Sequence, residues 1–235
     1  MLAAILTIGN EIVSGDTENT NASWLSRRLE ELGVKVVLTA AVPDETERIV
    51  EVVRREAPRV DHLIVTGGLG GTPDDITREA LAAAFEVRQV VFPELDADLR
   101  ARFTRDPDYA ARWAALPQGS SPLVNPNGGA PGFRIENVWV LPGLPSEMKA
   151  MFDRYADELN TGAPINAWRR RYSTRESTIS PALVEATNRW TTVSVGSYPS
   201  FYEIGPQVEV VLKSADKDTL GAAVAWLESE LDALT

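Results

Sequence analysis

The chain has 235 residues, of which 44% are apolar and 24% charged, with one histidine and no cysteine. That composition is typical of a globular protein with one large domain or one medium and one small domain. It excludes disulfides, thiolate chemistry and a zinc site built on several histidines. The net charge of −11 argues against nucleic acid as a partner.

Two further features bear on location. No apolar run approaches the roughly 20 residues of a membrane span, and the N-terminus lacks the basic start of a signal peptide. We therefore expect no membrane partner and a cytoplasmic location.

The first part of the chain alternates apolar strands with amphipathic helices. Strands that are almost continuously apolar, each followed by a helix, indicate a parallel sheet covered on both faces. The expected elements are strands at 3–8, 34–42 and 62–66 and helices at 20–32, 44–57 and 73–86.

The middle of the chain continues this pattern less regularly. Residues 92–116 have a helical pattern, which Pro107 divides into two helices. A turn-rich loop at 125–132 precedes a hairpin over 133–141, and a helix follows over 146–159 with Ser146 as its N-cap. Loops near residues 9, 67 and 142 all follow strands, so we expect them at the carboxyl edge of the sheet, where ligands bind.

The last 70 or so residues form a separate pattern after a linker at 161–164. In the strand at 207–213, apolar residues alternate with polar ones, so one face of its sheet is exposed. We expect a first domain over 1–160 and a small α+β domain over 165–235. The elements of the second are strands at 168–173, 193–198 and 207–213 and helices at 176–190 and 216–234.

The stretch 63–78 carries the most information about chemistry. A buried strand leads into Thr66-Gly-Gly-Leu-Gly-Gly-Thr72, and Pro73 and two aspartates follow. Glycines allow the backbone to approach a ligand closely, and the exposed N–H groups of such a turn suit phosphate oxygens. Asp74 and Asp75 would repel a bare anion, so a phosphate here implies a divalent cation. The same residues also suit a helix start, with Thr72 as N-cap and acids in the first turn.

Other groups at the strand ends limit the possible reactions. The serines have no histidine partner for nucleophilic catalysis, and the glycine cluster has no lysine of the Walker type. Metal held by carboxylates, Arg78 and backbone dipoles remain as the means of neutralising phosphate. These parts suit metal-assisted attack of water on a pyrophosphate, and they also suit nucleotidyl transfer.

Four ordered motifs carry a resemblance to a known family. Residues 9–21, 66–77, 125–132 and 141–148 resemble the molybdopterin-binding-like domain of the competence/damage-inducible protein A (CinA) family. The resemblance spans 3–160 strongly, and the last 70 residues more weakly through 196–199 and the strand at 208. It implies a three-layer α/β/α sandwich with a mostly parallel sheet, as in the MogA, MoaB and gephyrin type of molybdenum-cofactor protein.

The resemblance also implies an activity and site residues. In the CinA branch this domain is associated with pyrophosphatase activity on ADP-ribose, dependent on a divalent metal such as Mg²⁺ or Co²⁺ and helped by K⁺. Asp75 would bind metal or orient water, and Asp44 would assist. The candidate residues are Asp44 and Asp75 for catalysis, Asp74 and Asp75 for metal, and for phosphate or nucleotide Asn10, Glu11, Asn19, Asn21, Thr66, Gly67, Gly68, Leu69, Gly70, Thr72, Gly128, Pro142, Gly143 and Pro145.

Departures from the family pattern keep alternatives open. Gly71, Gly129 and Leu144 replace family residues, and Trp113 stands where an amide is common. A second hypothesis is therefore a protein that binds or adenylylates molybdopterin, and a third is a binding module with a degenerate site. We also expect a homo-oligomer, either dimer or trimer, and no deamidase domain of the kind that many bacterial members carry.

Overall fold

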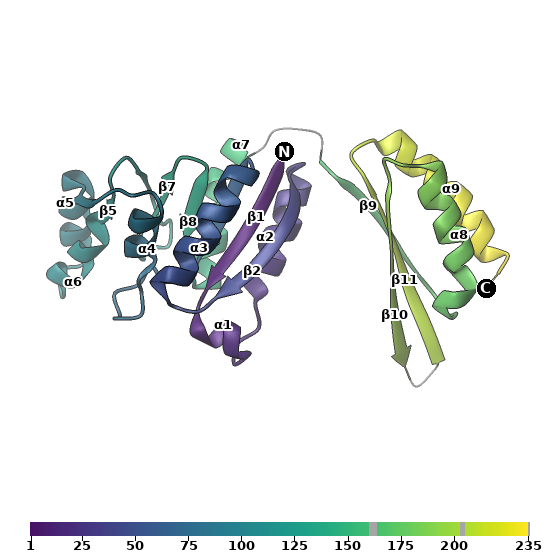
Figure 1. The fold of residues 1–235 in the computed structure, drawn as a ribbon, viewed down its shortest axis with the longest axis horizontal. Coiled ribbons are helices and arrows are strands. Elements are labelled where there is room, and N and C mark those ends of the chain that lie inside the picture. The colour runs from purple at the N-terminus through teal and green to yellow at the C-terminus, as the bar shows by residue number, and fades with distance from the viewer. Residues whose placement is uncertain (160–163, 203–204, 235) are drawn as a thin grey trace. The chain divides into compact units, whose positions relative to one another are not determined.

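The computed structural model describes residues 1–159, 164–202 and 205–234 (Figure 1). The chain divides into two compact units, Met1–Thr161 and Gly162–Thr235. The linker predicted at 161–164 lies largely outside the described residues. Over the described ranges, no helix combines the length and the apolar character needed to cross a membrane.

The first unit is built on a six-stranded sheet in the order β2-β1-β3-β8-β7-β6. The first four strands of that order run parallel, and the last two continue the sheet in antiparallel fashion. The sheet is therefore mostly parallel, as predicted. Its strands are β1 (Leu2–Ile8), β2 (Lys35–Val42), β3 (His62–Thr66), β6 (Ser121–Leu123), β7 (Gly132–Ile135) and β8 (Val138–Leu141).

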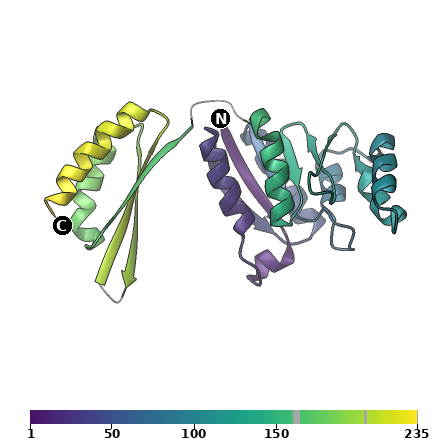
Figure 2. The same cartoon turned by 180° about the vertical axis from the view of Figure 1, so that it is seen from behind.

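Helices cover both faces of this sheet, which gives three layers. Alternate residues of β1 point to opposite faces: Leu6 packs with α3 and α4, whereas Ile5 packs with α2 and α7. Figure 1 shows α3 and α4 in front of the sheet, and Figure 2 shows α2 and α7 on the other side. The helices are α1 (Asn10–Ser14), α2 (Thr20–Glu31), α3 (Thr46–Glu56), α4 (Thr77–Ala84), α5 (Pro93–Arg102), α6 (Pro107–Ala111) and α7 (Pro145–Leu159).

The strand register brings three strand ends level with one another. Thr7 of β1 pairs with Thr66 of β3, and Thr66 pairs with Leu141 of β8. On the other side of β1, Ile8 pairs with Val42 at the end of β2. The loops that follow these four strands therefore leave the sheet at one edge, as the sequence predicted for those near 9, 67 and 142.

The predicted helix over 73–86 was wrong at its start. Helix α4 begins at Thr77, with Ile76 as its N-cap, so Thr72 is not a cap and the two aspartates are not first-turn acids. The carboxylate of Asp75 instead accepts hydrogen bonds from backbone N–H groups of the glycine turn. Similarly, α3 begins at Thr46, which leaves Asp44 in the preceding loop. Ser146 lies within α7, which starts at Pro145.

The sequence also predicted too much helix over 92–116. Its two helices end at Arg102 and Ala111, and the segment after them forms β5 (Ala115–Pro117). This strand pairs in antiparallel fashion with β4 (Gln89–Val91), which was not predicted. Strands of three residues are too short to show a period of two, and β6 was missed for the same reason.

The second unit is a three-stranded antiparallel sheet in the order β10-β11-β9 with two helices on one face. Val208, Val210 and Leu212 of β11 point to the helices and form the core. Its elements are β9 (Asn166–Tyr172), α8 (Glu176–Arg189), β10 (Ser194–Tyr202), β11 (Gly205–Ser214) and α9 (Lys217–Asp232).

Candidate functional site

The glycine turn after β3 is held by a set of inward-pointing carbonyl groups. Thr77 donates from its hydroxyl to the Gly67 carbonyl at 2.8 Å and from its backbone N–H to the Gly68 carbonyl at 3.2 Å. The guanidinium of Arg78 donates to the Leu69 carbonyl at 2.7 Å and to the Gly70 carbonyl at 2.8 Å. All four carbonyl groups are thus bound from the protein side.

This arrangement fixes where the N–H groups point. The chain has no cis peptide bond among its described residues, so the N–H that follows each of these carbonyls points the opposite way. In the described part of the chain, no acceptor binds the N–H groups of Gly68, Leu69 and Gly71. The Gly70 N–H between them binds Asp75, so three free donors of this turn point away from the interior. Backbone N–H groups in such turns are what anion-binding nests are made of.

Glycine is required at two positions of this turn. Gly67 has φ of 108°, and a Cβ there would lie 2.1 Å from the Ile8 carbonyl oxygen. Gly68 has φ of 64°, and its Cβ would lie 2.3 Å from the hydroxyl oxygen of Thr77. Both conformations are rare for residues with a side chain, and both spaces are already filled. The turn therefore depends on these glycines for its shape.

Asp75 closes the turn from its outer side. Its Oδ1 accepts from the Gly70 N–H and its Oδ2 from the Thr72 N–H, each at 2.8 Å. The Thr72 hydroxyl also lies 2.5 Å from Oδ2. A carboxylate has about four lone-pair positions, so three bonds leave one position, on Oδ1, for a cation. The neighbouring Asp74 is exposed, and the Thr72 hydroxyl lowers its pKa by hydrogen bonding to the carboxylate.

Arg78 and Trp113 stabilise the glycine turn. Arg78 does not line the cavity, although the sequence suggested it for neutralising phosphate. The buried guanidinium of Arg78 binds the turn's carbonyls, and burial lowers its pKa. The indole Nε1–H of Trp113 donates to the Gly70 carbonyl at 3.1 Å, and its ring packs edge-on against Phe103 and Tyr109. The departure from the family pattern at Trp113 thus supplies a second anchor for the Gly70 carbonyl.

The outer side of the glycine turn faces a cavity of about 350 Å³. Asp75 and Glu147 contribute its two carboxylates, and Trp113 contributes an aromatic edge. The loops at 129–130 and 142–144 complete the lining. No lysine or arginine belongs to the lining as the structure describes it.

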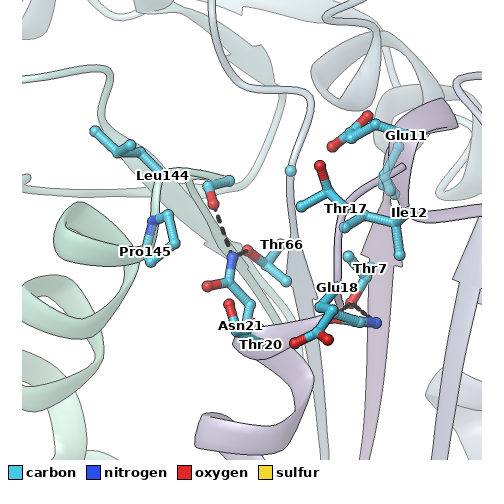
Figure 3. A pocket seen from close by; sticks show the side chains of 14 residues that line it. Thr7, Glu11, Ile12, Thr17, Glu18, Thr20, Asn21, Thr66, Leu144 and Pro145 are labelled. Carbon is cyan, nitrogen blue, oxygen red and sulfur yellow. Dashed lines mark hydrogen bonds between the residues drawn. The ribbon is translucent and has the colours of Figure 1, made fainter. Parts of the chain in front are cut away.

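A second pocket, of about 330 Å³, adjoins the end of β1 (Figure 3). The side chain of Asn21, only 7% exposed, connects the end of β3 with the loop after β8. Its Nδ2 donates to the Gly143 carbonyl at 2.7 Å and to the Thr66 hydroxyl at 3.3 Å. The Thr66 hydroxyl in turn donates to the Pro142 carbonyl at 2.8 Å. Gly143 and Leu144 line both pockets, so the two pockets adjoin at this loop.

Asp44 links the end of β2 to the loop after β1. Its Oδ2 accepts from the Asn10 N–H at 2.9 Å, and the Asn10 side chain accepts from the Asp44 N–H at 3.3 Å. Burial raises the pKa of the Asp44 carboxyl, and the negative charges of Glu11, Asp74 and Asp75 raise it further. These carboxylates therefore share one electrostatic environment at the edge of the sheet.

Glu147 and Asn125 were not among the candidate site residues. The buried Asn125 donates from Nδ2 to Glu147 Oε2 at 2.9 Å and to the Ala130 carbonyl at 3.0 Å. This bond holds Glu147 against the loop at 129–130, where a Cβ on Gly129 would lie 2.3 Å from Oε1. Glu147 lies in the first turn of α7, and its pairing with Asn125, 22 residues away, leaves no sequence signal.

The candidate residues thus fall into three groups. Those lining the pocket at β1 are Glu11, Asn19, Asn21, Thr66, Gly67, Gly143 and Pro145. Those lining the cavity at the glycine turn are Gly68, Leu69, Gly70, Asp75, Pro142 and Gly143. Those in neither lining are Asn10, Asp44, Thr72, Asp74 and Gly128.

The carboxylates do not form a ready metal site by themselves. Over the described residues, no group of three or more His, Cys, Asp or Glu side chains is placed to hold a metal ion. A hard cation such as Mg²⁺ nevertheless binds through one or two carboxylates when substrate phosphates and water supply the remaining oxygens. Asp75 and Glu147 are the carboxylates that line the cavity, together with Gly68 and Leu69, whose N–H groups are free.

Two family models match the chain. Residues 4–161 match the model described as a probable molybdopterin binding domain, and residues 171–235 match the model described as the middle domain of FAD synthase.

Relatives extend the comparison. Protein PAE0875 of Pyrobaculum aerophilum is 36% identical, with 98% of this chain and 92% of that protein covered. A putative competence-damage inducible protein of Caldicellulosiruptor saccharolyticus is 31% identical over the whole chain, which spans 59% of its length. The crystal structure of CinA, of unknown function, from Thermoplasma acidophilum superposes with a TM-score of 0.64 at 29% identity, over 67% of this chain and 97% of that one.

Proposed function

The chain belongs to the CinA family, with a probable molybdopterin binding domain over residues 4–161, and on that premise we propose that this domain is a metal-dependent nucleotide pyrophosphatase. Its substrate is ADP-ribose or a similar nucleotide diphosphate. The observation that carries the proposal is the group of three free N–H donors, Gly68, Leu69 and Gly71, directed away from the protein interior beside carboxylates.

The charges around the turn explain why a cation is needed. A pyrophosphate bound at the N–H groups would lie near Asp75 and Glu147, with no lysine or arginine from the described lining to offset the repulsion. A divalent ion such as Mg²⁺ or Co²⁺, held by these two carboxylates, would neutralise the phosphate charge and polarise the bond that is cleaved. The donor set is all oxygen, which is what Mg²⁺ prefers.

The protein side chains have separate tasks in this proposal. The N–H groups of Gly68 and Leu69 bind and orient phosphate oxygens, and Asp75 holds the turn in shape and would hold the cation. Asp44, whose pKa is raised by burial and neighbouring charge, acts as the proton acceptor for the attacking water. The pocket around Asn21 holds the organic part of the ligand, since it adjoins the turn across Gly143.

A direct assay tests the proposal. We expect the protein to release AMP from ADP-ribose with Mg²⁺ or Co²⁺ in a K⁺ buffer, and to release none after chelation of the metal. Asp75→Asn and Glu147→Gln should each lower the rate while the chain stays folded by circular dichroism. Absence of AMP with every metal, or full activity of both variants, would contradict the proposal.

Molybdopterin binding is a second candidate, favoured by the family match over residues 4–161. In that case the same free N–H groups would hold the phosphate of the pterin, and the pocket at Asn21 would hold the ring. Calorimetry with molybdopterin distinguishes the two: this candidate predicts tight binding without turnover of ADP-ribose. A variant such as Asn21→Leu should then weaken pterin binding.

A further inference from the structure

The positive charge of Arg78 lies beneath the glycine turn without an ion pair. Arg78 is 5% exposed, and within the described ranges no carboxylate forms a salt bridge with its guanidinium. The negative charges of Glu79 and Asp75 act on it only from beyond ion-pair distance. Removing an ion from water is costly unless an opposite charge compensates it. An anion bound on the outer side of the turn would supply part of that compensation.

The peptide between Gly70 and Gly71 is polarised directly by this charge. Its carbonyl oxygen accepts two hydrogen bonds, from Arg78 Nη2 at 2.8 Å and from Trp113 Nε1 at 3.1 Å. In each of the peptides that carry the other two free N–H groups, the carbonyl accepts one bond, from the uncharged Thr77. Linked hydrogen bonds polarise one another, and a charged donor makes the stronger bond. The N–H of Gly71 is therefore the most strongly polarised of the three free donors.

The ring of Tyr109, from helix α6, lies against Gly71. A Cβ on Gly71 would lie 2.4 Å from Cζ and 2.5 Å from the hydroxyl oxygen of Tyr109. Because a backbone nitrogen lies about 2.5 Å from the Cβ of its own residue, this hydroxyl lies within about 5 Å of the Gly71 nitrogen. Tyr109 is 40% exposed, and in the part of the chain that the structure describes its hydroxyl has no hydrogen-bond partner. One oxygen of an anion, at about 2.8 Å from each donor, can therefore contact both.

The free donors around the turn fall into two groups. Gly68 and Leu69 line the cavity, whereas Gly71 and Tyr109 are not part of its lining. The Gly70 N–H between the two groups is already bound to a carboxylate. The nitrogens of residues 69 and 71 are at most about 7 Å apart, because two residues of extended chain span no more. Two phosphate groups that share a bridging oxygen are long enough to reach both groups of donors.

We propose that the Gly71 N–H and the Tyr109 hydroxyl form a second anion subsite, which binds the second phosphate of a diphosphate whose first phosphate lies at Gly68 and Leu69. Its role rests on the proposed function, and through it the turn selects two linked phosphates over one. The charge of Arg78 lies behind the subsite and favours an anion there. Glycine at position 71 serves the subsite, since any larger residue would displace the tyrosine ring.

Calorimetry of the full chain with ADP and with AMP, each in the presence of Mg²⁺, tests this subsite. We expect the wild type to bind ADP more tightly than AMP. Tyr109→Phe keeps the ring beside Trp113 and removes only the hydroxyl. The dissociation constant of this variant for ADP should rise at least about tenfold, which corresponds to 1.4 kcal/mol, while that for AMP stays unchanged.

Gly71→Ala provides a second route to the same loss. It keeps the N–H, but its Cβ displaces the Tyr109 ring, so the affinity for ADP should fall and that for AMP should not. Combined with Tyr109→Phe it should add little, because both changes remove one contact. Tyr198→Phe in the second unit is the matched control, since the Tyr198 hydroxyl also lies close to a glycine, 3.2 Å from a Cβ placed on Gly196. It should leave both affinities unchanged.

Circular dichroism checks that the variants fold, and the exposed position of Tyr109 keeps the test open if Gly71→Ala does not. A wild type that binds ADP no more tightly than AMP overturns the subsite. So does a Tyr109→Phe variant that keeps its affinity for ADP or loses affinity for both ligands equally. The measurement requires no cleavage. Selective loss of ADP binding in a chain that does not hydrolyse ADP-ribose would therefore support the subsite and contradict the proposed hydrolysis.

Discussion

Two loops that each contain adjacent glycines have different structures. In the turn at 67–71, the buried residues Thr77 and Arg78 bind every carbonyl from Gly67 to Gly70, and three N–H groups are left free. In the loop at 125–131, Asn125 binds across the loop instead, and a Cβ on Gly128 would meet nothing within 4 Å. Glycine content alone therefore does not make an anion site; the direction in which the carbonyls are fixed does.

The largest expected effect comes from two alanine substitutions, one in each loop, whose effects on nucleotide binding are compared. Gly68→Ala puts a Cβ 2.3 Å from the Thr77 hydroxyl, so the turn must shift and its N–H groups lose their alignment. We expect nucleotide binding, measured by calorimetry, to weaken by about 100-fold. Gly128→Ala, the control, should cost about 1–2 kcal/mol of unfolding free energy from its positive φ and leave binding unchanged. Equal losses of nucleotide affinity in both variants would contradict the difference between the two loops.

Asp75→Asn tests the outer side of the turn. The backbone N–H groups of Gly70 and Thr72, which donate to Asp75, lose a charged acceptor. One of the two N–H groups would then face the NH₂ group of the asparagine amide. We expect the free energy of unfolding to fall by about 1.5–3 kcal/mol in urea titrations. We also expect the metal concentration needed for half-maximal activity to rise. Unchanged stability would show that the turn does not depend on this carboxylate.

Trp113→Phe tests a single inward bond. It keeps an aromatic ring against Phe103 and Tyr109 but removes the N–H that binds the Gly70 carbonyl. We expect a loss of about 0.5–1.5 kcal/mol in stability and a KM that rises more than kcat falls. Trp226→Phe in the second unit is the control and should leave KM unchanged. A KM that does not move for Trp113→Phe would mean that Arg78 alone orients this peptide.

The sequence predicted the layers of this fold better than it predicted the turn. Long apolar strands such as β1 and amphipathic helices such as α3 have a periodicity that one segment shows by itself. The carboxyl edge of the sheet follows from strand order, so the loops near 9, 67 and 142 were placed correctly. Strands of three residues, such as β4, have no such periodicity.

The contacts that shape the site were beyond sequence reasoning for a different reason. Thr72–Asp75 has the composition of a helix start. Local propensity cannot distinguish an N-cap at Thr72 from a carboxylate of Asp75 that accepts hydrogen bonds from the glycine turn. The bond from Trp113 to Gly70 spans 43 residues, and that from Asn125 to Glu147 spans 22. Such pairs arise only from tertiary packing.

The smallest expected effect on stability concerns Asp44 and depends on pH. Burial raises the pKa of Asp44 in the folded chain above its usual value of 3.8, so folding disfavours the ionised form. Asp44→Asn keeps an acceptor for the Asn10 N–H and removes that cost. We expect a higher Tm for the variant at pH 7, with a difference that shrinks as the pH falls toward 3.8. A lower Tm at pH 7 would contradict the assigned direction.

The most direct test of the account is an NMR titration of the ¹⁵N-labelled chain with ADP-ribose and Mg²⁺. If the turn at 67–71 binds phosphate through its free N–H groups, the amide resonances of Gly68, Leu69 and Gly71 should shift together and saturate, while that of Gly128 stays in place. Saturable binding that leaves those three amides unshifted would contradict the central claim.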